Sequence, residues 1–194
     1  MQTLFAQQEI EKALDVLAQQ IVSGIAVDER LFGSINRSVL LVGIRTCGVH
    51  LAARLQTILQ AKFGLQTQKG VLDITLYRDD LHSASHAIPQ LRSTQLPSSL
   101  EGKYIVLVDD VFYTGRTTRA ALQAMLDFGR PICIRLAVLI DRKCHELPIQ
   151  PDFKAFEVEP IQQRRIELQM REEGFLEDKI VCLSSVSCID PIVK

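Results

Sequence analysis

The sequence has no tryptophan, few other aromatic residues and no long apolar run. Aromatic residues make up 6% of the 194 residues. No stretch approaches the roughly 18–20 consecutive apolar residues that a membrane-spanning helix needs, so we expect no transmembrane segment and no membrane partner. The start, MQTLFAQQEIEKAL, lacks the basic and apolar regions of a secretory signal. The sequence therefore predicts a cytoplasmic protein.

An excess of charge of one sign is also missing. Lysine and arginine number 22 against 23 aspartate and glutamate, a net charge of −1. This balance argues against a strongly basic nucleic-acid-binding module. The length suffices for one domain with a complete hydrophobic core, and we expect a single domain over residues 1–194.

A paired cysteine pattern is absent. The five cysteines form an odd set without a CxxC motif. Cys144 and His145 are adjacent but have no partner cluster, which is a poor zinc signature. In a chain without a visible signal peptide, we expect free thiols, several of them buried as small apolar residues.

The most informative stretch that is present covers residues 104–122. A short apolar run typical of a buried parallel strand is followed by Asp109 and Asp110, a hydroxyl-rich turn over residues 114–118, and good helix formers. In open α/β sheets, ligands bind at the carboxyl ends of strands, and helix N-termini hold phosphate. The two carboxylates are placed to accept hydrogen bonds from ribose hydroxyls or to hold a divalent cation.

Two other interpretations of this stretch are weighed. The first is a buried strand and a helix N-terminus with an incidental acid pair. The second, a Walker-type nucleotide loop, is excluded by spacing, because no glycine lies four residues before Gly115 and Arg116 stands where a lysine belongs.

A second strand, turn and helix follow the same logic. Residues 38–44 (SVLLVGI) predict a buried strand, residues 45–48 a turn with a glycine, and residues 49–62 a helix. The turn forms a second anion cradle to which Arg45 adds fixed positive charge. Taken alone it is compatible with an ordinary strand–turn–helix unit. Taken together, two cradles suit one sugar that carries a pyrophosphate and a phosphate.

The remaining periodicities complete the predicted architecture. We expect an α/β fold, with a doubly wound, mostly parallel sheet flanked by helices on both faces and a small hood. The further expected elements are an amphipathic helix over residues 6–23 that ends at Gly24, a strand over 69–77, a helix over 117–128, a strand over 132–140, a helix over 161–173 and a strand over 180–183.

Three motifs then carry a resemblance. VGIRTCG (residues 42–48), LDITLYRDDL (72–81) and VLVDDVFYTGRT (106–117) resemble the type I phosphoribosyltransferases, and most closely the bifunctional pyrimidine operon regulator/uracil phosphoribosyltransferase family. The resemblance covers residues 9–153. Cys47 departs from it, because the family's turn has arginine there. The tail over residues 154–194 looks divergent, with a solvated face or a subunit contact as its expected role.

The resemblance implies an enzyme that converts uracil and phosphoribosyl pyrophosphate into UMP and pyrophosphate with Mg²⁺. Asp109 and Asp110 would be catalytic and would hold the metal or the ribose hydroxyls. Arg78 would neutralise the departing pyrophosphate, although a surface arginine paired with Asp79 or Asp80 remains an alternative. Residues 78–100 would form a mobile loop that closes over the substrate. The implied substrate contacts are Arg45, Thr46, Cys47, Gly48, Tyr113, Thr114, Gly115, Arg116, Thr117, Thr118, Val138, Asp141 and Arg142.

The family's second activity, binding messenger RNA, is disfavoured by the residues present. Regulators of this family carry Thr, Arg and His on the first helix, where this chain has Asp15, Val16 and Gln19. RNA affinity needs clustered positive charge. We therefore prefer an enzyme without the regulatory function. An RNA-binding attenuator responsive to UMP and a nucleotide-sensing relative without turnover remain alternatives. The resemblance also implies a homodimer or higher homo-oligomer.

Overall fold

A five-stranded parallel sheet forms the centre of the molecule. The computed structural model describes residues 1–33, 39–77, 93–158 and 164–183. The strand order is β3-β2-β4-β5-β6, and every neighbouring pair is parallel. Its strands are β2 (Val39–Ile44), β3 (Gln68–Leu72), β4 (Tyr104–Phe112), β5 (Cys133–Asp141) and β6 (Phe153–Glu157).

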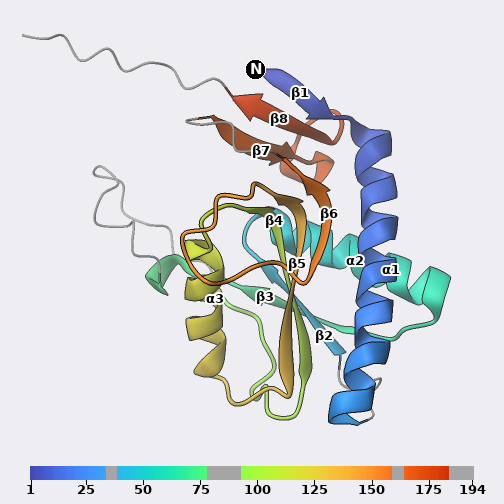
Figure 1. Cartoon of the computed structure of the whole chain (residues 1–194), viewed down its shortest axis with the longest axis vertical. Coiled ribbons are helices and arrows are strands. Elements are labelled where there is room, and N and C mark those ends of the chain that lie inside the picture. The colour runs from blue at the N-terminus through green and yellow to red at the C-terminus, as the bar shows by residue number, and fades with distance from the viewer. Residues whose placement is uncertain (34–38, 78–92, 159–163, 184–194) are drawn as a thin grey trace, which may run out of the picture.

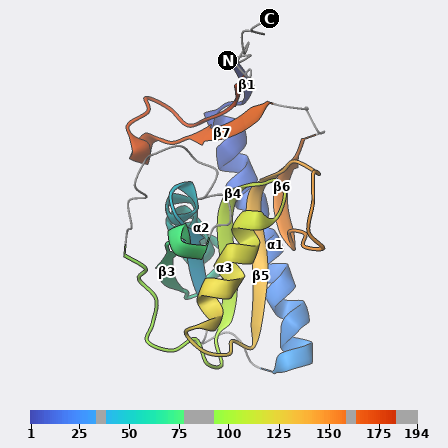
Figure 2. The same ribbon diagram turned by 90° about the vertical axis from the view of Figure 1, so that its left-hand side faces the viewer.

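Helices cover both faces of this sheet. The helices α1 (Gln7–Phe32) and α2 (Cys47–Phe63) lie on one side, and α3 (Arg116–Leu126) lies on the other (Figures 1 and 2). Successive residues of a strand point to opposite faces. In β4, Tyr104, Val106 and Val108 therefore pack with α1 and α2, whereas Ile105 and Leu107 pack with α3. This confirms the predicted doubly wound fold.

A small antiparallel sheet lies across one end of the molecule, at the top of Figure 1. We call residues 1–5 and 164–183 the hood. Its strand order is β1-β8-β7, and a 3-10 turn at Arg171–Glu173 connects β7 to β8. The strands are β1 (Gln2–Phe5), β7 (Arg165–Gln169) and β8 (Lys179–Leu183).

The hood shares the core of the main domain. Ile166, Leu168 and Ile180 are buried in the same cluster as the inner faces of α1 and α2. Phe5 of β1 stacks on Phe156 of β6 with ring centroids 3.9 Å apart. The hood is thus packed continuously with the main sheet and its helices.

The first helix is longer than predicted. It begins after Ala6, whose N–H donates to the Glu9 carboxylate (2.9 Å), and it continues through Gly24 to Phe32. Gly24 is not a helix stop. A Cβ at this position would lie 2.5 Å from the Phe153 ring, so the glycine makes room for β6. Gly33, with φ +81°, ends the helix instead.

Two other predicted elements are corrected. The strand expected over residues 69–77 ends at Leu72, and Thr75–Tyr77 form a 3-10 turn that leaves Leu76 exposed. The helix expected over residues 161–173 is wrong: residues 165–169 form strand β7, and the 3-10 turn follows it.

The expected mobile loop over residues 78–100 is described only at its end. Residues 78–92, and with them Arg78, lie outside the described residues. The final part is tied to the sheet, because Gln95 forms an antiparallel bridge with Val71 and Leu100 is fully buried. The described part of the expected loop is therefore anchored to β3 at Gln95 and to the core at Leu100.

Candidate functional site

Both predicted turns line one cleft of about 380 Å³ at the carboxyl edge of the parallel sheet. The turn after β2 contributes Arg45, Thr46 and Cys47, and the end of β4 with the start of α3 contributes Asp109, Asp110 and Thr117. The other lining residues are Val111, which follows the acid pair on β4, and Ile74, Arg165, Glu167, Leu168 and Glu173 from elsewhere in the chain.

The acid pair lies within β4, because the strand continues to Phe112. Asp109 is 7% exposed, and its carboxylate accepts the N–H of Asp110 at 3.0 Å. Asp110 is half-buried. Both carboxylates line the cleft, and their position on a paired central strand fixes the backbone that carries them.

The turn before α3 has the geometry of an anion cradle. Gly115 adopts a left-handed conformation (φ +90°), which favours glycine and starts the helix at Arg116. The first N–H groups of a helix have no partner within the helix and can hold phosphate oxygens. Among the described residues of this turn, Thr117 lines the cleft, whereas Thr118 is buried and Arg116 forms an exposed ion pair with Glu146 (2.9 Å).

The turn after β2 lies very close to β4. A Cβ on Gly48 would be 2.4 Å from the carbonyl oxygen of Val108, and a Cβ on Gly43 would be 2.5 Å from the carbonyl oxygen of Gly48. Two glycines thus allow α2 to begin beside the acid-bearing strand. Gly48 therefore permits the close packing of α2 on β4, and the substrate contact that the resemblance implies for it stays a prediction.

Arg45 lines this cleft and carries one buried donor without a partner among the described residues. Its Nη2 donates to the carbonyl of Ser93 at 3.1 Å. Its Nε is the one buried side-chain nitrogen or oxygen without a hydrogen-bond partner among the described residues. Buried donors are normally paired. The guanidinium of Arg45 also brings fixed positive charge to the cleft lining, which suits an anionic ligand.

Cys47 faces the hood. Its Sγ lies 3.6 Å from the carbonyl oxygen of Leu168 and 3.5 Å from Oε2 of Glu173. Burial raises the pKa of the thiol, and the negative charges of Asp110 and Glu173 raise it further. The side chain is a neutral thiol that links the turn to the hood.

The hood supplies one wall of the cleft. This wall was not predicted from the sequence. Arg165, Glu167 and Leu168 come from β7, and Glu173 comes from the 3-10 turn. The tail was expected to form a solvated face or a subunit contact, whereas in the structure four of its residues line the cleft. The alternation of Ile166, Leu168 and Met170, all buried, is the strand signal that could have revealed it.

Three of the implied substrate contacts, Val138, Asp141 and Arg142, lie on or directly after β5. Val138 is 0% exposed in the core and is absent from the cleft lining, so its contact with substrate stays a prediction. Asp141 is also buried and accepts hydrogen bonds from His145 (2.8 Å) and Lys154 (3.1 Å). Burial alone would raise the pKa of Asp141, but these hydrogen bonds outweigh it and lower the pKa. Asp141 is therefore a held carboxylate within the protein.

Arg142 contacts the segment that leads from β4 into α3. Its guanidinium lies 4.0 Å from the centre of the Tyr113 ring, and its backbone N–H donates to the carbonyl of Phe112 at 3.0 Å. Thr114 accepts N–H groups from Glu146 and Leu147 through its carbonyl oxygen. The segment after β5 thus holds the turn that follows the acid pair.

The donor set fits a magnesium ion that arrives with a ligand. Among the described residues, no group of three or more His, Cys, Asp or Glu side chains is arranged to hold a metal ion. Mg²⁺ is commonly bound by one or two carboxylates together with substrate phosphates and waters. Asp109 and Asp110, which line the cleft beside an anion cradle, match this mode.

Comparisons with known proteins agree with this geometry. Residues 2–173 match the family described as phosphoribosyl transferase domain. The bifunctional protein PyrR of Chloroflexus aurantiacus is 45% identical over 92% of this chain and 93% of its own. The bifunctional protein PyrR of Pelotomaculum thermopropionicum is 45% identical over 91% of this chain and 92% of its own. The predicted end of the resemblance near Lys154 is therefore wrong.

Solved structures share the fold. A hypoxanthine phosphoribosyltransferase of Trypanosoma cruzi superposes with a TM-score of 0.68 at 19% identity, covering 95% of this chain and 97% of its own. One from Staphylococcus aureus gives a TM-score of 0.67 at 15% identity, covering 95% and 93%. Separately, no helix within the described ranges combines the length and apolar character needed to cross a membrane.

Proposed function

Because the chain belongs to the phosphoribosyl transferase domain family, and within it to the PyrR family, we propose that it transfers the phosphoribosyl group of phosphoribosyl pyrophosphate to uracil. The products are UMP and pyrophosphate. The observation that carries the proposal is the single cleft lined by both turns. A sugar with a pyrophosphate at one end and a phosphate at the other needs two anion sites on one cavity.

The proposed roles follow the positions of the residues. The turn with Arg45 and Thr46 binds the pyrophosphate, and the N-terminus of α3 with Thr117 binds the 5′-phosphate. Asp109 and Asp110 accept hydrogen bonds from the ribose hydroxyls and hold Mg²⁺. The ion, when bound, supplies positive charge to the diphosphate.

The protein's contribution is then positional and electrostatic. Departure of pyrophosphate leaves positive charge on the sugar, and two carboxylates beside the ribose stabilise that charge. Two fixed anion sites hold the sugar in one orientation while the base attacks. The hood wall reduces the access of water to the reacting carbon. Uracil is proposed as the base from the motifs that flank the phosphate turn.

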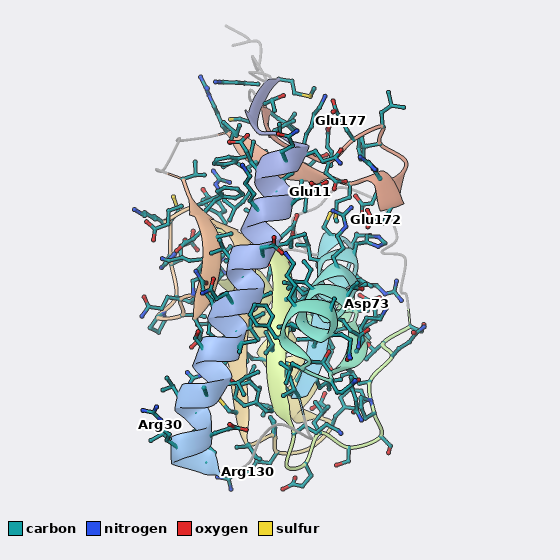
Figure 3. All side chains as sticks on the ribbon, turned by 90° about the vertical axis from the view of Figure 1, so that its right-hand side faces the viewer. Glu11, Arg30, Asp73, Arg130, Glu172 and Glu177 are labelled. Carbon is teal, nitrogen blue, oxygen red and sulfur yellow. The ribbon has the colours of Figure 1, made fainter. Side chains whose placement is uncertain are left out.

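Purified protein, radiolabelled uracil, phosphoribosyl pyrophosphate and Mg²⁺ test the proposal. We expect UMP to form, and we expect Asp109→Asn and Asp110→Asn each to reduce kcat by about 100-fold or more, since each removes a charge that stabilises the transition state. Glu11→Gln is the matched control, because Glu11 lies on the exposed face of α1 (Figure 3). Unchanged turnover in both aspartate variants would remove these residues from the active site.

The relatives are named bifunctional protein PyrR, and this name favours a second candidate function. This is the UMP-responsive binding of leader RNA from pyrimidine genes. On α1, Asp15 forms an ion pair with Lys62 (2.7 Å), which reduces the free positive charge on this face. RNA binding with a steep dependence on salt would support the second function.

Absence of UMP formation with retained binding of phosphoribosyl pyrophosphate would instead support a nucleotide sensor.

A further inference from the structure

The hood places an acidic side chain beside the turn that the proposed function assigns to pyrophosphate. Oε2 of Glu173 lies 3.5 Å from Sγ of Cys47, and both residues line the cleft with Arg45 and Thr46. Among the described residues, no lysine, arginine or histidine forms an ion pair with Glu173. Within the part of the chain that the structure describes, a carboxylate without an ion-pair partner thus borders the turn that the proposed function assigns to pyrophosphate.

The second hood carboxylate in the cleft differs in this respect. Glu167 of β7 lies 3.7 Å from the guanidinium of Arg165, which also lines the cleft. The charge of Glu167 is therefore partly balanced within the cleft. Glu173 differs from Glu167 because it has no ion-pair partner among the described residues.

Arg54 of α2 forms ion pairs with the segment of the hood that carries Glu173. Arg54 binds Glu172 through two hydrogen bonds (2.8 and 2.7 Å) and Asp178 through two more (2.5 and 3.2 Å). Asp178 is 3% exposed and also accepts the N–H of Arg171 at 3.0 Å. Figure 3 shows Glu172 between the hood and α2. Because Glu172 is held against α2, its neighbour Glu173 is fixed against Cys47 at the start of the same helix.

We propose that Glu173 is a specificity-determining residue that disfavours uncomplexed diphosphate at the pyrophosphate turn and favours the magnesium complex. The inference rests on the proposed function. Free pyrophosphate carries several negative charges, and a carboxylate at the edge of its site repels it. Magnesium neutralises part of that charge, so the complex experiences less repulsion. The same repulsion assists the release of pyrophosphate that has lost its metal ion.

Isothermal titration calorimetry with pyrophosphate tests this inference without turnover. Wild type and Glu173→Gln are titrated with pyrophosphate in EDTA and again in excess Mg²⁺. We expect Glu173→Gln to bind the metal-free ligand about three- to tenfold more tightly, the size of a partly screened like-charge contact. We expect the affinity for the magnesium complex to change by less than about twofold, because the complex carries less charge.

Glu177→Gln is the matched control, because Glu177 lies in the hood, pairs with Lys179 (2.5 Å) and is absent from the cleft lining (Figure 3). It removes the same charge and should leave both affinities unchanged. Equal metal-free affinity in wild type and Glu173→Gln, while wild type binds the magnesium complex, would overturn this inference alone. Failure of wild type to bind pyrophosphate in either form would overturn the proposed function as well.

Discussion

At Cys47, burial and the negative charges of neighbouring acids both raise the pKa of the thiol. The side chain lies between the turn after β2 and the hood, where it contacts Leu168 and Glu173. The resemblance made this position notable, because arginine was expected there. The structure gives the residue a packing role: a small neutral side chain fills a site that opens toward the hood.

The reactivity of this thiol is a direct test. Only the thiolate reacts with alkylating agents, and burial raises the pKa of Cys47, so little thiolate forms near pH 8. We expect iodoacetamide to modify Cys47 at least about tenfold more slowly in the folded protein than in the urea-unfolded chain. Peptide mapping by mass spectrometry over time measures both rates. The half-buried Cys144 provides an internal comparison and should react sooner than Cys47. Equal rates in the folded and unfolded chain would contradict the buried position.

At the scale of elements, the length and composition of α1 reflect the segments that pack against it. Its N-terminal half contacts the hood side of the core, and its middle contacts β6 through Gly24 and Phe153. A glycine in mid-helix is costly by propensity. Here the absence of a side chain lets the Phe153 ring approach the helix backbone, so packing overrides propensity.

Gly24→Ala separates these two effects. Alanine is about 1 kcal/mol better than glycine inside a helix. The added Cβ, however, would lie 2.5 Å from the Phe153 ring, and overpacking a core costs about 1–3 kcal/mol. We expect Gly24→Ala to lower the free energy of unfolding in urea. In a Phe153→Leu background the same substitution should be neutral or stabilising. A gain of stability in the wild-type background would show that the contact relaxes without cost.

At the scale of the whole molecule, a buried polar network holds the end opposite the hood. Asp28 of α1 is 2% exposed and accepts hydrogen bonds from Tyr104 of β4 (2.7 Å) and Arg135 of β5 (2.8 and 2.5 Å). Arg135 also donates to Asp152, just before β6 (2.9 Å). One carboxylate thus joins the long helix to the two central strands.

This network predicts a pH dependence of stability. The hydrogen bond from Arg135 lowers the pKa of Asp28 despite the opposing effect of burial. The folded state therefore keeps the carboxylate ionised at a pH where the unfolded chain binds a proton. The stabilisation is present above the unfolded pKa of about 4 and is lost as pH falls through the folded pKa.

We expect Asp28→Asn to lower the free energy of unfolding at pH 7 by about 2–3 kcal/mol, because the variant removes the charged partner of Arg135. The difference from wild type should shrink as pH falls from 5 to 3. Urea titrations across this range measure it. Asp15→Asn is the control, since its ion pair with Lys62 is half exposed and should contribute less than about 1 kcal/mol. A gap that stays constant down to pH 3 would rule out the ionised carboxylate as its cause.

The sequence by itself determined the parallel core and the half of the cleft lining that the two turns and the acid pair provide. The buried strands β2, β4 and β5 are continuous apolar runs, and each turn that follows β2 or β4 carries its glycine and polar residues within a few positions. Local patterns of this kind do not depend on distant parts of the chain. Arg45, Asp109, Asp110 and Thr117 were therefore predicted, and the structure brings them to one cleft.

Only the tertiary structure decided the hood and its wall of the cleft. Strand β1 pairs with β8, from the opposite end of the chain, and β7 pairs with β8. Pairing over the separation between β1 and β8 leaves little local signal, so β1 went unpredicted. Strand β6 was also missed, and β7 was taken for a helix despite its apolar alternation. The position of Glu173 depends further on Arg54, a contact between α2 and the hood. Side-chain contacts between distant segments arise only when the chain has folded, which is why sequence periodicity did not reveal them.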